Sequence, residues 1–132
     1  MEIESRIGKV VCSQERIYSI LSDFSNLSDY IPADQVSDFT SDSDNCSFTV
    51  ANVGKFGMRI MEREPSKLVK ITNDASVPFQ FFMWIQIKEV EANDSRVKIT
   101  FKADLNPMIK MVAKNPLTKF IEGLIDKIET IR

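Results

Sequence analysis

Apolar residues occupy every second position through two long stretches in the second half of the chain. One stretch carries them at Phe79, Phe81, Met83, Ile85 and Ile87, and the other at Val97, Ile99, Phe101, Ala103 and Leu105. Alternation with a period of two is the pattern of a β-strand that buries one face. The intervening residues 92–95 are rich in turn formers. The two stretches are therefore predicted to pair as an antiparallel hairpin.

Shorter stretches of the same kind precede this hairpin. A first strand is expected to reach about residue 11. Its odd positions include Ile3, Ser5, Ile7 and Val11, which would share one face. The Asp- and Ser-rich stretch 34–45 predicts an edge strand with a hydrophilic hairpin loop. Two further strands are expected on either side of Gly54, where a positive φ costs little, and another at 68–72. The sheet should have about six to seven antiparallel strands.

Helical spacing appears after the first strand and again at the end of the chain. Ser13 suits an N-cap, and apolar residues follow it at helical spacing, while residues 23–32 fit a second short helix that Pro32 closes. From Pro107 onward the period is again 3.6, with an apolar stripe over 117–131. Pro116 is expected to kink this segment or force a second start, which leaves a final helix of about sixteen residues, roughly 24 Å long.

These elements predict one α+β domain over residues 1–132, since 132 residues suit a single core. The order is a strand, two short helices, strands in hairpin succession and one long helix. Only the last helix is long enough to cover one face of the antiparallel sheet.

The amino-acid composition limits the kinds of molecule that the protein is expected to bind. The net charge of −2 provides no excess of cations for nucleic acid, so none is expected as a partner. No segment has the roughly 20 apolar residues of a membrane span, and the first residues lack an apolar signal-peptide core. Cys12 and Cys46 match no zinc or redox spacing. The sequence predicts a cytoplasmic protein without a metal or cofactor and without stable membrane insertion.

The segment from Val11 to Leu27 resembles the passage from the first strand to the first helix in a known superfamily. It includes the D-x-x-N turn of that superfamily, which runs here from Asp23 to Asn26. Residues 107–117 and 120–131 resemble the closing helix of its small bacterial members. Over its whole length the chain resembles the helix-grip, or SRPBCC, superfamily of START lipid-transfer domains, pollen-allergen-like proteins, polyketide cyclases and uncharacterised bacterial proteins. This resemblance implies a curved sheet wrapped around the last helix, with a cavity between them.

The resemblance further implies binding or carriage of a small hydrophobic ligand, such as a lipid or a polyketide, in that cavity. Aromatic, methionine and aliphatic side chains from the short helices, the long strand and the last helix are expected to line it. They are Phe24, Tyr30, Ile31, Phe79, Phe81, Met83, Ile85, Met108, Met111, Phe120 and Leu124. The competing interpretation is that these residues fill an ordinary core. Carriage requires free apolar room beneath the helix, with an entrance.

A cyclase- or aromatase-like enzyme is the second hypothesis. The chain has no histidine, and no catalytic constellation is visible. Glu62 shares the parity of Phe56, Met58 and Ile60, which makes it the only carboxylate expected at the cavity mouth. In this hypothesis Glu62, Tyr30 or a water molecule would transfer the proton. A strand-end glutamate is more often simply solvated. Ser5 is a further polar candidate for the ligand, although bonding to nearby backbone explains it better.

A protein-interaction module, similar to co-chaperone domains of the superfamily, is the third hypothesis. Phe82 and Trp84 have the opposite parity to Phe81 and Met83. In a regular strand they would lie on the outer face of the sheet and form a contact surface, for example in a homodimer. A bulge that turns Trp84 inward would explain them equally well.

Overall fold

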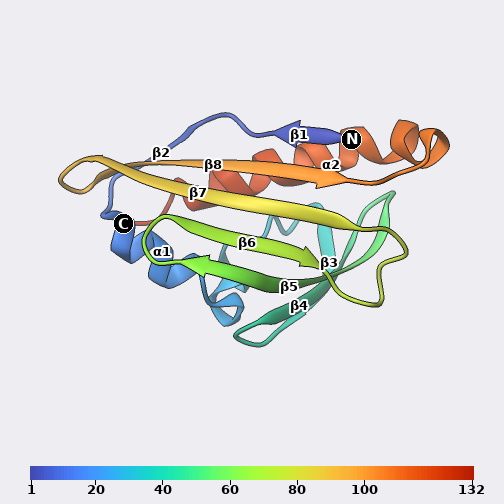
Figure 1. Ribbon diagram of the computed structural model, residues 1–132, viewed down its shortest axis with the longest axis horizontal. Helices are drawn as coiled ribbons and strands as arrows, with labels where there is room; N and C mark the ends of the chain where they lie inside the picture. Colours follow the sequence, from blue (N-terminus) through green and yellow to red (C-terminus); the bar gives the residue numbers. More distant parts are fainter.

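Eight antiparallel strands form one sheet that curves around a single long helix (Figure 1). The computed structural model describes all residues from 1 to 132. The strand order is β1-β8-β7-β6-β5-β4-β3, and β2 also pairs with β8. The strands are β1 (Glu2–Glu4), β2 (Gly8–Val10), β3 (Val36–Ser41), β4 (Asn45–Val50), β5 (Gly54–Glu64), β6 (Leu68–Asn73), β7 (Phe81–Glu91) and β8 (Asp94–Ala103). The predicted α+β helix-grip architecture is confirmed.

Two short helices follow β2, as the sequence predicts. Helix α1 (Gln14–Leu21) begins after Ser13, whose hydroxyl accepts a hydrogen bond from the Arg16 amide. The 3₁₀ helix η1 (Phe24–Asp29) begins after Asp23, whose carboxylate accepts from the Ser25 amide at 2.9 Å. These caps satisfy N–H groups that have no partner inside a helix.

The last helix, α2 (Pro107–Ile128), runs without interruption for 22 residues on one face of the sheet (Figure 1). The expected second start at Pro116 is wrong. A proline at this position removes the hydrogen bond to the carbonyl of Val112. Val112 lies on the exposed side of the helix, where that carbonyl can be hydrated instead. The proline is therefore tolerated.

The first strand is split by one extra residue opposite β8. Glu4 pairs with Thr100, whereas Gly8 pairs with Val97, so three residues of one strand face two of the other. Ser5 fills this bulge: its hydroxyl accepts from the Ile99 amide at 2.9 Å and donates to the Arg6 carbonyl at 2.7 Å. The bonding of Ser5 to nearby backbone is thus confirmed, and Ile7 is turned outward into solvent.

The opposite edge of the sheet is also irregular. Strand β3 changes its register against β4 between Ser37 and Thr40. Within that interval Asp38 has a φ of 55°, which lies in the left-handed region. The prediction of a polar edge strand over this stretch is confirmed.

Phenylalanines stack through one half of the core. Phe48 lies 5.3 Å from Phe120 between ring centroids, and Phe81 lies 5.2 Å from Phe101. Phe56 connects these pairs, 6.0 Å from Phe48 and 5.4 Å from Phe81. These rings come from β4, β5, β7, β8 and α2, so one aromatic cluster joins the sheet to the helix.

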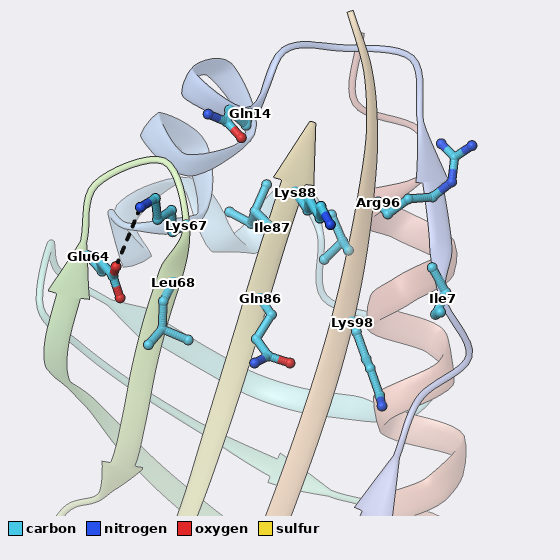
Figure 2. A pocket seen from close by; sticks show the side chains of 11 residues that line it. Ile7, Gln14, Glu64, Lys67, Leu68, Gln86, Ile87, Lys88, Arg96 and Lys98 are labelled. Carbon is cyan, nitrogen blue, oxygen red and sulfur yellow. Dashed lines mark ion pairs between the residues drawn. The ribbon is translucent and has the colours of Figure 1, made fainter. Parts of the chain in front are cut away.

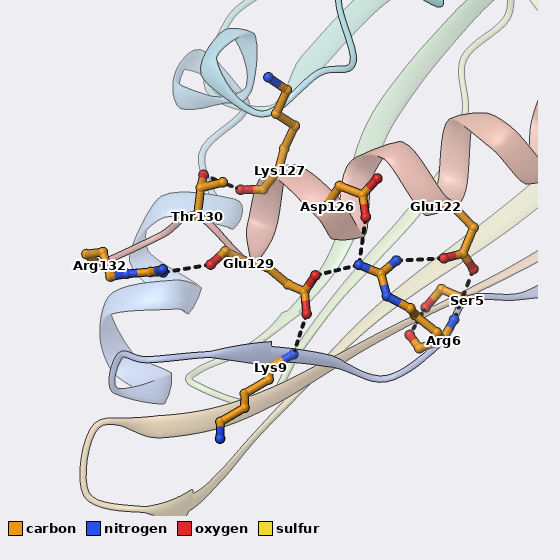
Figure 3. A network of polar contacts seen from close by, with 9 residues as sticks. All are labelled: Ser5, Arg6, Lys9, Glu122, Asp126, Lys127, Glu129, Thr130 and Arg132. Atoms are coloured by element: carbon orange, nitrogen blue, oxygen red, sulfur yellow. Dashed lines mark hydrogen bonds and ion pairs between the residues drawn. The ribbon is translucent and has the colours of Figure 1, made fainter.

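Arg6 links the bulge between β1 and β2 to the end of α2 (Figure 3). Its guanidinium donates to Glu122 at 2.8 Å, to Asp126 at 2.6 Å and to Glu129. Asp126 follows Glu122 by four residues, and Glu129 follows Asp126 by three, so the three carboxylates share one face of the helix. Their hydrogen bonds, that of Glu122 above all, raise the pKa of Arg6 above its ordinary value.

Replacing Arg6 with glutamine should lower the free energy of unfolding by about 1 kcal/mol, because a half-exposed network is largely screened by water. The loss should shrink in 1 M salt, where the Debye length is about 3 Å. Urea titration at low and high salt measures both effects. Arg59→Gln is the matched control, because Arg59 forms no ion pair; an equal loss in the two variants would contradict a specific network.

Candidate functional site

An apolar pocket lies between the two short helices, the inner face of the sheet and α2. It is lined by Leu21, Phe24, Leu27, Tyr30, Ile31, Met58, Ile71, Met83, Ile85, Leu124 and Ile128. Its free volume is only about 10 Å³, about the size of a single water probe. The side chains therefore fill this space, and open room beneath α2 with an entrance, which carriage was expected to require, is absent from this conformation.

Six of the eleven predicted ligand-binding residues meet in this pocket. They are Phe24, Tyr30, Ile31, Met83, Ile85 and Leu124. Phe79, Phe81 and Phe120 belong instead to the phenylalanine cluster beside it. Met108 and Met111 are exposed to solvent, so their expected place in the cavity wall is wrong. The buried stripe of α2 begins only at Ala113, after the two turns that carry both methionines.

Two methionines and three leucines contribute to the wall of this pocket, beside the rings of Phe24 and Tyr30. Met58 and Met83 come from β5 and β7, and Leu27 comes from η1. Methionine can repack around guests of different shape, because its side chain is unbranched and polarisable. Tyr30 is partly exposed and carries the only hydroxyl among the lining residues. It thus marks the side of the pocket nearest to solvent.

Residues 22–32, which include η1, close the pocket, and we call them the closing segment. Few polar contacts hold this segment to the sheet and its turns. The Phe24 amide donates to the Ser43 carbonyl at 3.0 Å. Arg63 donates to the Ser22 carbonyl at 3.0 Å and to the Asp44 carboxylate at 2.7 Å. Arg63 therefore ties the junction of α1 and η1 to the β3–β4 turn.

The loop after η1 packs directly on α2. A Cβ added to Gly123 would lie 2.9 Å from the Cβ of Pro32, closer than carbon atoms normally approach. Glycine costs about 1 kcal/mol in a helix interior relative to alanine. Close packing of Pro32 on α2 explains its presence here. The closing segment thus rests on Pro32 at one end and on Arg63 at the other.

A bulge in β5 reverses the expected orientation of Glu62 and sets that of Arg63, which follows it. Ile60 pairs with the buried Ile71, but the register then shifts by one residue, so Glu62 pairs with Lys70 and Arg63 with Val69. Val69 faces the core and Lys70 faces outward. The expectation that Glu62 points to the cavity mouth is wrong, because the extra residue at Met61 moves it to the outer face. Sequence parity gives no sign of such a bulge, which is why Arg63 was missed.

Phe82 and Trp84 lie on the outer face of the sheet, the face turned away from α2. Strand β7 keeps a regular register with β8 from Phe81 to Glu89. The alternative of a bulge that turns Trp84 inward is therefore wrong. The two rings lie 5.9 Å apart, and the ammonium of Lys70 lies 5.0 Å and 5.4 Å from their centroids. Contacts with lysine thus cover part of this aromatic pair.

A surface hollow with a volume of about 590 Å³ also lies on the outer face (Figure 2). Leu68, Gln86 and Lys98 cross it on three adjacent strands, and Ile7 borders it. Three of its four cations form ion pairs: Lys67 with Glu64, Arg96 with Asp94, and Lys98 with Glu4. Most of its positive charge is thereby compensated within the chain. This groove was missed because Ile7 was expected to face inward.

Cys46 is buried on the inner face of β4. Burial, together with the charges of Asp74 and Asp42, raises the pKa of its thiol from 9.0 to about 12. The thiolate is the reactive form of cysteine. The thiol is therefore nearly inert at neutral pH.

In a Cys12→Ser variant, Cys46 should react with an aromatic disulfide reagent at pH 8 at least about 100-fold more slowly in the native protein than in urea. Absorbance of the released thiolate measures both rates. The free energy of unfolding should also fall above pH 9, because the unfolded thiol ionises there while the folded one stays protonated. Equal rates in the native and unfolded protein would contradict this assignment.

No protein-family model matches the chain, and no curated protein matches its sequence. Solved structures do match it. TTHA0849 from Thermus thermophilus is 14% identical, with a TM-score of 0.75 over 98% of this chain and 94% of that one. A START superfamily protein from Mycobacterium smegmatis is 16% identical, with a TM-score of 0.63 over 96% of this chain and 98% of that one. The chain has the START fold.

The START fold also occurs in the di-domain ARO/CYC BexL from the BE-7585A biosynthetic pathway. That protein is 13% identical, and the match covers 98% of this chain and 46% of that one at a TM-score of 0.67. One START fold can support different functions, so the likeness establishes architecture alone. Within this START fold, no three His, Cys, Asp or Glu residues are grouped to hold a metal ion. None of its helices has the length and apolar character to cross a membrane.

Proposed function

We propose that the protein binds a small hydrophobic ligand, such as a lipid or a polyketide, in the apolar pocket beneath α2. The observation that carries this proposal is a wall of eleven apolar or aromatic residues, of which four belong to residues 22–32, the segment that closes the pocket. Because the free volume is only about 10 Å³, the ligand must displace side chains as it enters. Binding is therefore coupled to movement of residues 22–32.

The position of the flexible residues supports this route. The phenylalanine cluster fixes one half of the core, whereas Met58, Met83 and Leu27 line the half beside η1. Burial of apolar ligand surface contributes roughly 25 cal/mol per Å². Part of that gain offsets the loss of contacts between η1 and the sheet. A cyclase-like reaction has less support, because Glu62 lies on the outer face and no polar atom faces the interior of the pocket.

Native mass spectrometry of freshly purified protein should show an added mass in the range of lipids, and the protein should take up a fluorescent fatty acid. In Arg63→Gln the fatty acid should associate several-fold faster, because the contacts with Ser22 and Asp44 are lost. Arg59→Gln, on the same strand but without an ion pair, should leave the rate unchanged. Ligand-free spectra together with no uptake of the fatty acid would refute the proposed function.

A further inference from the structure

The first two turns of α2 expose four large apolar side chains. The exposed fractions are 79% for Met108, 45% for Ile109, 86% for Met111 and 62% for Val112. They stand in a contiguous part of the chain, and the helix buries its first residue only at Ala113. Isolated exposed apolar residues are common, but a cluster on one short segment marks an interaction surface.

The four side chains form a single face of the helix. At 3.6 residues per turn, Met111, Met108, Val112 and Ile109 lie within an arc of about 160°. The buried residues of α2, such as Leu117 and Leu124, lie on the opposite side and pack on the sheet. The exposed face therefore belongs to no core, and no other part of the chain covers it. We call these four residues the apolar tip of α2.

Before Glu122 every charged side chain of α2 is a lysine, whereas Asp104 precedes the helix and Asp34 lines a surface hollow together with Lys119. Lys110, Lys114 and Lys119 are exposed, and no carboxylate occurs between Asp104 and Glu122. The first turn of α2 contains no acidic residue either. A helix N-terminus carries a partial positive charge, which favours acidic residues and disfavours lysine. This arrangement is unfavourable in isolation, and an anionic partner would compensate it.

We propose that the apolar tip docks on a lipid bilayer that contains anionic lipids. Met108, Met111, Val112 and Ile109 would enter the boundary between headgroups and acyl chains. Lys119, which points to the same side of the helix as the tip, and Lys114, one turn from Met111, would contact lipid phosphates. A second copy of the chain suits this surface less well, because pairing two tips would bring together the lysines of two helices that carry no carboxylate before Glu122. The docking is interfacial, in agreement with the lack of a helix able to span the bilayer.

Flotation with vesicles tests the docking. The full chain should bind vesicles of phosphatidylcholine with 30% phosphatidylserine at least about 10-fold more strongly than pure phosphatidylcholine vesicles, and 1 M salt should weaken this binding. The double variant Met108→Ser with Met111→Ser should lose at least about 10-fold in binding. The matched control, Val11→Ser with Val90→Ser, removes exposed apolar residues elsewhere and should bind like the original protein.

Both double variants change exposed residues only, so both should give the circular dichroism spectrum of the folded protein. No binding to anionic vesicles, or equal binding by the two double variants, would overturn the proposal. A second outcome would also overturn it. If the original protein is a dimer, the variant Met108→Ser with Met111→Ser is a monomer, and vesicles have no effect on either, then a second copy of the chain occupies the tip. The docking goes beyond the proposed ligand binding, and uptake of the fluorescent fatty acid in the absence of vesicles should be unaffected by the tip variants.

Discussion

Phe81→Ala is expected to lower the free energy of unfolding by about 3–5 kcal/mol. Phe81 is fully buried, and its ring lies 5.2 Å from Phe101 and 5.4 Å from Phe56. Truncation removes the transfer free energy of the ring and leaves a cavity that the stacked neighbours cannot fill. The shift of the urea midpoint at an unchanged slope measures the loss.

Phe82→Ala is the matched control, one residue away on the same strand. Phe82 lies on the outer face and contacts Lys70 and Trp84, so its truncation should cost only about 1 kcal/mol. The ratio of the two losses therefore reports which face of β7 is buried. Similar losses for the two variants would show that the register of β7 is incorrect.

Met83→Ala is expected to lower the free energy of unfolding by about 2–5 kcal/mol, and a bound ligand should restore part of it. Met83 is buried in the wall of the apolar pocket. Removing its thioether creates the room that the native conformation lacks. At a ligand concentration of about 100 times Kd, binding would stabilise the folded state by about 2.7 kcal/mol.

Urea titration of Met83→Ala with and without the fluorescent fatty acid measures this recovery. Met61→Ala is the control, because Met61 is the exposed extra residue of the β5 bulge and should lose little stability. An equal loss in both variants would contradict the placement of Met83. Loss of stability in Met83→Ala without recovery at saturating fatty acid would count against ligand binding in this pocket.

The fold could be predicted from the sequence where the periodicity was long and regular. The alternation around Phe81 and Met83 gives the buried face of β7 correctly, and the stripe at 117–131 gives the buried face of α2. The prediction fails wherever one extra residue enters a strand. Bulges at Ser5 and at Met61 reverse all parities beyond them, and they arise from three-dimensional pairing rather than from local pattern.

The sequence predicts where the candidate pocket lies, but not whether the pocket is open or filled by side chains. Phe24, Tyr30 and Leu124 do meet, because each belongs to an element whose buried face the sequence shows. Whether space remains among them depends on how side chains interdigitate, which periodicity does not report. Met108 was misplaced for a related reason: apolar character suggests burial, but α2 extends beyond the part of the core that would cover it.

The irregular borders of the sheet have a consequence for behaviour at high concentration. Strand β3 changes register at Asp38, and the opposite border is interrupted between β1 and β2. A straight row of free amide and carbonyl groups is the template on which foreign strands add to form fibrils. Neither border presents such a row. The native chain should therefore resist fibrillar aggregation while folded.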